Sequence, residues 1–315
     1  MIYIDIHGRL GNQLFQYAFA RSLMNDLNEN IIIGSYTLKR RDSSWKIDLI
    51  HFNIRNTKSV NNKLPLWLTK TSLSQKALIF LYVIEMRSKK SAKEISKVQL
   101  KWQDKLKKNG IYWMKNGLEN VYKKSTTNTF LYGHFENPML FNHIRDELLI
   151  EFTPLSPLLE KNKTLYEKIK DCESVCISIR RGDYVENPEY SSIFNICDQK
   201  YYEKAIKLIY DRIVNPQFVV FSDDVNWAKE NLNLPVGTLF ETGDDPVWEK
   251  LRLMYSCKHF IISNSTFSWW AQYLSRNIDK IVISPNIWKT DSTFSPLIEK
   301  SFLKIDVERK EFKTS

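Results

Sequence analysis

The chain has 315 residues, of which 43 % are hydrophobic and 26 % are charged, and its formal net charge is +10. This composition excludes a largely disordered protein, and no uncharged run reaches the ~18 residues that a membrane-spanning helix needs. The length favours two domains, and the basic balance favours an anionic partner such as a nucleotide, a nucleic acid or a membrane surface.

Cysteine usage and the first residues indicate the compartment. Cys172, Cys176, Cys197 and Cys257 show no CxxC pair and no zinc-type spacing, so we interpret them as reduced thiols. The start does not resemble a signal peptide, because no basic segment precedes the apolar run and Asp5 interrupts it. We expect a cytoplasmic protein, with a peripheral position on the inner face of the plasma membrane as the alternative.

The N-terminal residues predict a strand, a turn and a helix. Residues 2–6 predict a strand, 13–27 a helix with one apolar face, and 31–33 a second strand. The turn between the first strand and the helix contains His7, Gly8 and Gly11 but lacks the GxGxxG spacing of a dinucleotide site. Its place at a strand end makes His7 a candidate functional residue.

A helical insertion is predicted at about residues 64–110. Residues 35–63 are irregular and polar, whereas 64–84 are apolar and aromatic. Residues 87–108 carry nine Lys or Arg against Glu94 and Asp104. We interpret this segment as a helix docked on the core with a solvated basic face, and contact with an anionic membrane is the alternative. A nucleic-acid patch is disfavoured, because no known binding module accompanies the charge.

A domain boundary is predicted near residue 153. Residues 130–136 predict a strand running into a turn, and 140–149 a short helix. Two prolines, Pro154 and Pro157, then precede a new helix. The expected domains are 1–153 and 154–315, and the C-terminal tail is expected to pack back on the first domain.

The second half alternates strands with helices, which predicts a parallel sheet with helices on both faces. The expected strands are residues 175–179, 218–221, 239–240, 259–262 and 280–283. The expected helices are residues 200–214, 225–232, 246–255 and a helix beginning at 269.

Three of these strands end in polar clusters. The clusters are Arg180-Arg181-Gly182-Asp183, Ser222-Asp223-Asp224 and residues 263–268. Right-handed crossovers place such ends on one edge of a sheet, where open α/β proteins bind ligands. Two arginines, several carboxylates and a run of hydroxyls would suit a nucleoside diphosphate, whose phosphate oxygens accept paired guanidinium donors.

Individual roles follow from this chemistry. Ser265 and Thr266, at a helix N-terminus, are expected to donate to the diphosphate, and capping that helix is a compatible role. Asp223 is expected to accept hydrogen bonds from guanine. No two aspartates are separated by a single residue, and HExxH and Walker motifs are absent, so we expect no divalent metal ion.

Four blocks of the sequence together resemble the α-1,2-fucosyltransferases, glycosyltransferase family 11. The blocks are residues 8–18 (GRLGNQLFQYA), 179–184 (IRRGDY), 221–224 (FSDD) and 262–270 (ISNSTFSWW). A weaker block at 130–135 is similar to a Gly-Tyr-Phe type of family motif and has His134 at the tyrosine position. Family members often carry a histidine where this chain has Ser178.

The resemblance implies an α/β fold of the GT-B type, with two Rossmann-like domains facing each other across a cleft. It implies an inverting enzyme that moves L-fucose from GDP-β-L-fucose to the 2-hydroxyl of a terminal β-galactoside, in bacterial surface-glycan synthesis, with no cofactor or metal. The residues expected on the donor side are Arg180, Arg181, Ser178, Asp223, Asp224, Asn264, Ser265, Thr266 and Phe267. Those expected on the acceptor side are His7, Arg9, Asn12, Gln13 and Glu136.

Catalysis is expected to use Arg180 against the charge that develops on the β-phosphate, while Arg181 holds the motif loop through an ion pair. The base that deprotonates the acceptor is left open among Asp183, Glu186, Glu189, Asp5 and His7, with Asp183 and His7 ranked first. Two alternatives remain. One is a GDP-fucose-dependent transferase with a different acceptor, and the other is a non-enzymatic glycan- or nucleotide-binding protein.

Overall fold

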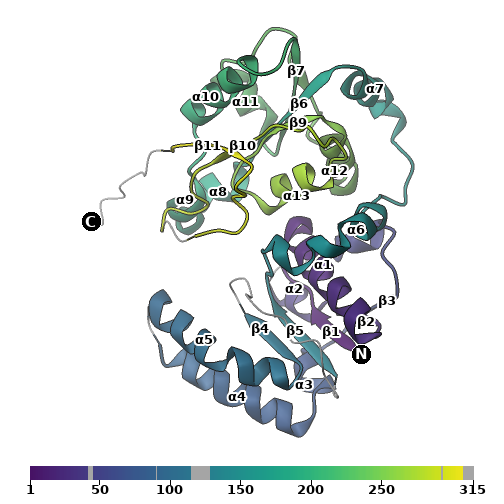
Figure 1. Cartoon of the computed structure of the whole chain (residues 1–315), viewed down its shortest axis with the longest axis vertical. Helices are drawn as coiled ribbons and strands as arrows, with labels where there is room; N and C mark the ends of the chain where they lie inside the picture. The colour runs from purple at the N-terminus through teal and green to yellow at the C-terminus, as the bar shows by residue number, and fades with distance from the viewer. Residues whose placement is uncertain (42–44, 90, 115–127, 292–293, 308–315) are drawn as a thin grey trace. The chain divides into compact units, whose positions relative to one another are not determined.

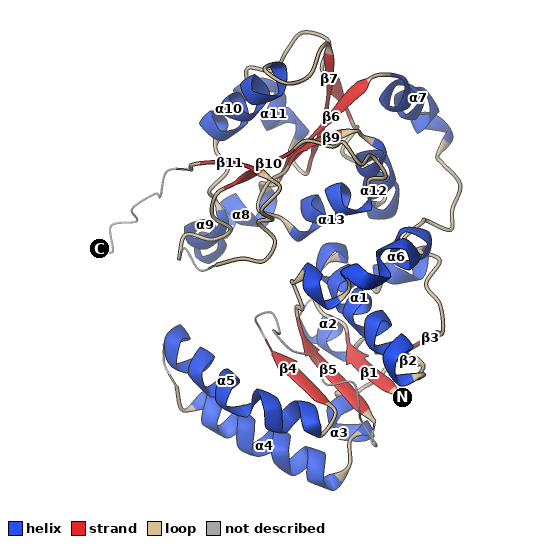
Figure 2. Cartoon of the chain, viewed as in Figure 1, coloured by secondary structure: helices blue, strands red, loops and turns tan. Residues whose placement is uncertain are grey.

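The structure is a computed structural model that describes residues 1–41, 45–89, 91–114, 128–291 and 294–307. The chain divides into two compact units, Met1–Phe152 and Thr153–Ser315. Each unit contains one parallel sheet with helices on both of its faces (Figure 2). The predicted parallel α/β organisation is therefore confirmed. The last residues of the tail, 308–315, for which packing was predicted, lie outside the described residues.

Unit 1 is built on a five-stranded sheet of order β3-β2-β1-β5-β4. Its strands are β1 (Ile2–Asp5), β2 (Ile31–Gly34), β3 (Thr57–Val60), β4 (Ile111–Met114) and β5 (Thr129–Gly133). Its helices are α1 (Leu10–Leu27), α2 (Tyr36–Arg41), α3 (Leu66–Lys70), α4 (Leu73–Arg87), α5 (Ala92–Lys108) and α6 (Arg145–Glu151) (Figure 1). The described residues of this unit also contain the 3-10 turns η1 (Asp48–His51), η2 (Pro138–Leu140) and η3 (Asn142–Ile144).

The alternation of side chains along the strands separates the two faces of this sheet. One face, with Ile111 and Phe130, packs under α3, α4 and α5, whose buried residues include Ile79 and Tyr82. On the other face, Phe19 of α1 meets Tyr112 with ring centroids 5.5 Å apart. The region 35–63, predicted to be irregular, contains a helix, a 3-10 turn and an edge strand, so that prediction was wrong. The strand β4 was missed as well.

Unit 2 is built on a six-stranded sheet of order β11-β10-β9-β6-β7-β8. Its strands are β6 (Glu173–Ile179), β7 (Pro216–Ser222), β8 (Leu239–Phe240), β9 (His259–Ile261), β10 (Val282–Pro285) and β11 (Leu303–Ile305). Its helices are α7 (Lys163–Asp171), α8 (Gly182–Glu186), α9 (Pro188–Phe194), α10 (Gln199–Tyr210), α11 (Val225–Asn231), α12 (Val247–Ser256) and α13 (Thr266–Leu274), with the 3-10 turn η4 (Glu160–Asn162) before α7.

The core of unit 2 follows the strand pattern that the sequence predicted. Val175, Ile177 and Ile179 of β6 alternate onto one face with Val220 of β7, and α10 and α11 cover them. The five predicted strands and the helices at 200–214, 225–232 and 246–255 are confirmed to within a few residues. Helix α13 begins at Thr266, three residues earlier than expected, and α8 and α9 were not predicted.

Asp5 fastens the end of β1 to the connection that leads into α3. Its carboxylate accepts hydrogen bonds from Asn62 Nδ2 at 2.8 Å and from the backbone N–H of Leu66 at 2.6 Å. The side chain is buried, and burial raises the pKa of this carboxyl while these two bonds oppose the rise. Asp5 therefore has a structural role at the strand end, whether or not it is also the catalytic base.

We expect Asp5→Ala to destabilise unit 1 by about 1–3 kcal/mol, because it removes the acceptor of the buried Leu66 N–H and one of the two acceptors of the half-buried Asn62 amide. Thermal unfolding followed by circular dichroism measures the loss. Asp279→Ala is the matched control, since Asp279 is exposed in unit 2 and surface substitutions of this kind stay within about 0.5 kcal/mol. Equal unfolding temperatures for the two variants would contradict the role given to Asp5.

Candidate active site

The candidate site of unit 2 lies where the strand order reverses. From β6 the chain proceeds outward through β7 and β8 and then returns to β9, on the other side of β6. The reversal between β6 and β9 is a topological switch point, and ligands of open α/β sheets bind outside the carboxyl ends of strands at such a point. The three polar clusters predicted from the sequence follow β6, β7 and β9. The structure therefore brings them to one edge.

Arg180 is held by carboxylates from two strand ends. Its Nη1 lies 2.7 Å from Asp223 Oδ2, and its Nη2 is ion-paired with Asp183. The guanidinium carbon also lies 5.5 Å from the centre of the Tyr184 ring. Because two carboxylates and a ring fix its orientation, this guanidinium is preorganised although it is about one-fifth exposed.

Arg181 turns away from Arg180 toward the start of α11. Its Nε lies 3.3 Å from Asp224 Oδ2, and its guanidinium carbon lies 3.8 Å from the centre of the Trp227 ring. Its backbone N–H donates to Asp223 Oδ1 at 2.9 Å. The side chain therefore ties the β6 loop to the β7 loop, in the geometry expected of a loop-holding ion pair.

Gly182 is required at the next position because of the same aspartate. A Cβ built on Gly182 would lie 2.8 Å from Asp223 Oδ2, closer than real Cβ contacts come. The side chain of Asp223 could give way only by leaving Arg180. Asp183, Glu186 and Glu189 follow on α8 and α9, where Asp183 is part-buried and the two glutamates are exposed.

The segment after β9 is mostly buried and inward-facing. Ser178 Oγ lies 2.6 Å from Ser268 Oγ, which lies 3.0 Å from Ser263 Oγ. Asn264 donates to the carbonyls of Phe194 and Trp288, each at 3.0 Å. Ser178 and Asn264, both predicted as donor-side residues, thus have partners inside the protein and position the loops around them.

The N-terminus of α13 presents the more accessible residues of this segment. Ser265 occupies the N-cap position, but its side chain makes no capping hydrogen bond, so the predicted capping contact is absent. Thr266 and Phe267, in the first turn, are half-buried. A nine-residue helix whose first turn is partly open offers backbone N–H groups to an anion at this edge.

Unit 1 has its own switch point, between β1 and β5. His7 follows β1, and its ring lies 4.6 Å from the ring of His134, which follows β5. His134 Nδ1 in turn lies 3.6 Å from Glu136 Oε1. The predicted residues His7 and Glu136 are therefore brought together through His134.

The other predicted residues of unit 1 differ in exposure. Arg9 is exposed at the N-cap position of α1, and Asn12 is half-buried beside Gly8. Gln13 is buried: it donates to the carbonyls of Gly8 and Lys46 and accepts from the backbone N–H of Asp48. Arg9 and Asn12 remain accessible, whereas Gln13 has a positioning role.

Several positioning residues were not singled out from the sequence. The side chain of Gln16, on α1, accepts from the backbone N–H of His7 at 3.1 Å and donates to the His7 carbonyl at 2.7 Å. These two bonds fix the backbone of His7. Tyr17 and Arg21 both contact the buried Glu151 of α6. These residues lie within or beside the 8–18 block, and only the position of their partners in space explains them.

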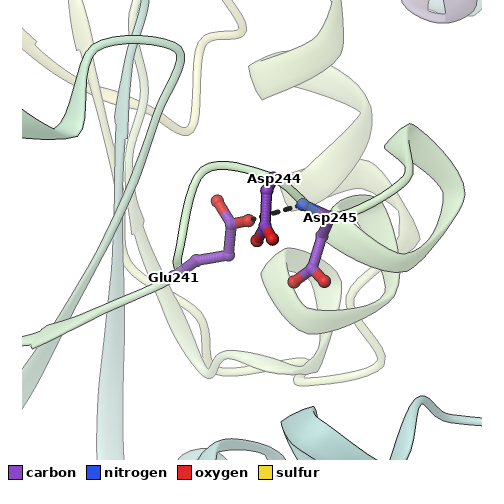
Figure 3. A group of neighbouring side chains, drawn as sticks. All are labelled: Glu241, Asp244 and Asp245. Carbon is purple, nitrogen blue, oxygen red and sulfur yellow. Dashed lines mark hydrogen bonds between the residues drawn. The ribbon is translucent and has the colours of Figure 1, made fainter.

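The loop after β8 carries a cluster of three acidic residues. Glu241, Asp244 and Asp245 bring carboxylate oxygens within 4.8 Å of one another (Figure 3). Two ammonium groups already lie against this cluster, Lys250 Nζ at 3.0 Å from Glu241 and Lys161 Nζ at 2.9 Å from Asp245. The lysines supply the positive charge that a bound cation would otherwise supply, so the cluster is a structural ion-pair network.

Membrane-spanning elements were also sought along the residues that the structure describes. None of the helices there combines the length and the apolar character that crossing a bilayer requires.

Comparisons with known proteins found relatives that match nearly the whole chain. The chain is 30 % identical to the O-antigen biosynthesis glycosyltransferase WbnK of Escherichia coli, over 96 % of this chain and 100 % of that protein. It is 29 % identical to an alpha-1,2-colitosyltransferase of Escherichia coli, over 93 % of this chain and 95 % of that protein. The human galactoside alpha-(1,2)-fucosyltransferase 1 is 28 % identical over 52 % of this chain and 47 % of that protein.

The fold matches a solved structure of the GT-B class. The NodZ alpha-1,6-fucosyltransferase, soaked with GDP-fucose, superposes with a TM-score of 0.51 at 12 % identity, over 90 % of this chain and 94 % of that one. The GT-B fold class predicted from the resemblance is thereby confirmed. The sequence model of Glycosyl transferase family 11 matches residues 1–306, and the chain is therefore a glycosyltransferase of family 11.

Proposed function

We propose that this glycosyltransferase moves L-fucose from GDP-β-L-fucose to the 2-hydroxyl of a terminal β-galactoside, with inversion to an α-1,2 linkage. The observation that carries the proposal is the position of Arg180 at the switch point of unit 2, preoriented by Asp183 and Asp223. The names of three relatives support it, since one acts in O-antigen synthesis and two make alpha-1,2 linkages. Synthesis of a bacterial surface glycan is the corresponding process.

The donor is proposed to place its diphosphate against Arg180 and the first turn of α13. A guanidinium and backbone N–H groups complement phosphate oxygens, and the partly open Thr266 adds a hydroxyl donor. Each oxygen of Asp223 already accepts one bond but has a second lone pair, so it keeps capacity for a guanine N–H. We propose that no divalent ion takes part and that Arg180 stabilises the leaving diphosphate.

Asp183 gives the proposed mechanism its acid–base step. In the structure Arg180 is paired with both Asp183 and Asp223, so an arriving phosphate would compete with these carboxylates for the guanidinium. Asp223 also accepts from the Arg181 N–H and so ties two loops together, and Asp183 lies on the short helix α8. We propose that phosphate displaces Asp183, which then accepts the proton of the acceptor hydroxyl.

The bonds in this step balance without a co-reactant. The acceptor oxygen attacks the anomeric carbon as the bond from that carbon to the phosphate oxygen breaks. The electron pair of the breaking bond goes to the diphosphate beside Arg180, and the hydroxyl proton goes to the carboxylate. His7, fixed by Gln16 at the unit 1 switch point, is the alternative base.

A second donor is favoured by one of the relatives. The alpha-1,2-colitosyltransferase covers nearly the whole chain at an identity close to that of the first relative. Colitose is a deoxygenated relative of fucose, so the same diphosphate contacts would serve either donor. The discriminating experiment must therefore present both sugars.

The direct test is to incubate the protein with GDP-fucose or GDP-colitose and a panel of β-galactosides, in the presence of EDTA. We expect transfer of one donor sugar to a terminal galactose, and two-dimensional NMR of the product to show an α-1,2 linkage. Transfer that requires added Mg²⁺ or Mn²⁺ would contradict the metal-independent mechanism. If the protein binds GDP but neither transfers nor hydrolyses the sugar of either donor, the enzymatic proposal is contradicted.

Arg180→Ala is expected to lower kcat by about 10²–10³, in line with the loss of one electrostatic donor to a developing charge. The matched control is Arg212→Ala, because Arg212 is an exposed arginine at the end of α10 that bonds only to its own turn among the described contacts. Initial rates at saturating acceptor, with unfolding temperatures for both variants, measure the effect. Near-normal turnover by Arg180→Ala would remove Arg180 from the mechanism.

Asp183→Asn is expected to separate binding from chemistry. Removing the carboxylate that competes for Arg180 should leave the affinity for GDP unchanged or increase it, while kcat falls by about 10²–10⁴ through loss of the base. Calorimetric titration with GDP and steady-state rates give the two quantities. If kcat survives in Asp183→Asn and falls instead in His7→Gln, the base is His7.

A further inference from the structure

The helical hairpin of unit 1, formed by α4 and α5, has an apolar outer face that the fold does not use. Figure 1 shows the two helices side by side. They are joined by Glu85 of α4, which accepts from Lys101 Nζ and Trp102 Nε1 of α5, each at 2.7 Å. The inner face of α4 packs on the sheet through buried side chains such as Ile79 and Tyr82.

The outer face of α4 repeats at helical spacing. Exposed apolar residues occupy positions i, i+4, i+7, i+8 and i+11 of one stripe: Leu73, Ala77, Phe80, Leu81 and Ile84. Phe80 is 64 % exposed and Leu73 is 83 % exposed. The stripe runs for about 17 Å along the helix, and the side chains of Lys76 and Arg87 border it. Leu64, Leu68 and Leu100 of the same region are also exposed.

A basic stripe runs along the exposed side of the neighbouring helix. Lys97, Lys101, Lys105 and Lys108 are all exposed and recur every three or four residues of α5. The Lys101–Glu85 pair joins this stripe to α4 at the residue that follows Ile84 in the chain. An apolar stripe on one helix and a cationic stripe on the next therefore lie together on one hairpin.

From this juxtaposition we propose that the α4–α5 hairpin is the surface by which the protein docks on an anionic lipid bilayer. The apolar side chains of α4 enter the boundary between headgroups and acyl chains, and the lysines of α5 contact the anionic headgroups. Two such signals are what stable peripheral binding needs, because either alone gives weak attachment. Contiguous exposed apolar residues rimmed by charged ones are typical of surfaces that bind a protein or a membrane.

Lipid fits this hairpin better than the other partners that its charge allows. A nucleic acid would use the lysines but leave the aliphatic stripe in water. A second copy of the chain would cover the apolar stripe but bring the lysines of two subunits near one another. The inference does not depend on the proposed donor, acceptor or catalytic base.

The test is flotation of the full-length protein with vesicles of phosphatidylcholine, with and without phosphatidylglycerol. We expect binding that requires phosphatidylglycerol and weakens with salt. Phe80→Ser combined with Leu81→Ser should lower the partition coefficient by about tenfold or more. Lys97→Gln combined with Lys108→Gln should lower it about fivefold for each lysine.

Matched controls come from unit 2. Phe294→Ser removes a phenylalanine that is 89 % exposed, and Lys170→Gln with Lys204→Gln removes two exposed lysines. Both controls should bind vesicles like the unaltered protein. Unfolding temperatures verify that the hairpin variants fold. We expect these temperatures to match that of the unaltered protein, because the replaced side chains are exposed.

Three results would overturn the proposal. The first is vesicle binding that the hairpin and control variants reduce equally. The second is absence of vesicle binding together with a dimer, seen by sedimentation velocity, that Phe80→Ser with Leu81→Ser dissociates. The third is absence of vesicle binding together with RNA binding that depends on Lys97 and Lys108 but not on Phe80.

Discussion

The ion pair between Arg180 and Asp223 is the interaction on which the candidate site depends. The parallel register sets Ile179 of β6 opposite Ser222 of β7, so the residues that follow leave the sheet side by side. Asp223 then accepts from the guanidinium of Arg180 and from the backbone N–H of Arg181. One carboxylate thereby fixes both the direction of the Arg180 side chain and the course of its loop. The missing side chain of Gly182 is what lets that carboxylate approach.

The same topological device occurs in both units. In each unit the first strand of the chain lies inside the sheet and not at its edge. The next strands add on one side of it, and the later strands add on the other side. In unit 2 the reversal separates β6 from β9, and in unit 1 it separates β1 from β5. The residues predicted from the sequence on the donor side lie at or just beyond the ends of β6, β7 and β9, and His7 and Glu136 follow β1 and β5. Strand order therefore explains why segments far apart in sequence supply neighbouring polar groups.

The sequence predicted what strong local patterns determine. The run from Val175 to Ile179 is buried on both faces of the sheet, so its apolar composition and abrupt polar end were unmistakable. The edge strand β3, by contrast, has the polar sequence Thr-Lys-Ser-Val and is only partly buried, so it carries no alternation to detect. Helices α8 and α9 are too short to show a period. The N-cap of α9, Asn187, is formed by local hydrogen bonds rather than by a hydrophobic pattern.

Side-chain roles were harder to predict than positions. Ser178, Asn264 and Gln13 were selected as polar residues at strand ends and turns, and all three bond mainly within the protein. Sequence cannot distinguish a polar group that faces a ligand from one that satisfies a buried carbonyl, because both need the same donors. Gln16, by contrast, was not selected from the sequence. It lies on a helix, one turn beyond the residues that drew attention, and its partner is the backbone of His7.

The α4–α5 hairpin follows from a different constraint on the fold. The strands β3 and β4 are consecutive in the chain but lie at opposite edges of the five-stranded sheet, so the connection must cross the whole sheet, about 19 Å. One apolar face on each crossing helix satisfies that requirement, and Ile79, Tyr82, Val98 and Leu106 provide it. Folding therefore gives no reason for Phe80, Leu81 and Ile84 to be apolar on the outer side of α4. An apolar outer face beside a row of lysines lowers the solubility of a protein in water. Contact with an anionic lipid surface would bury the apolar side chains and pair the lysines with headgroups.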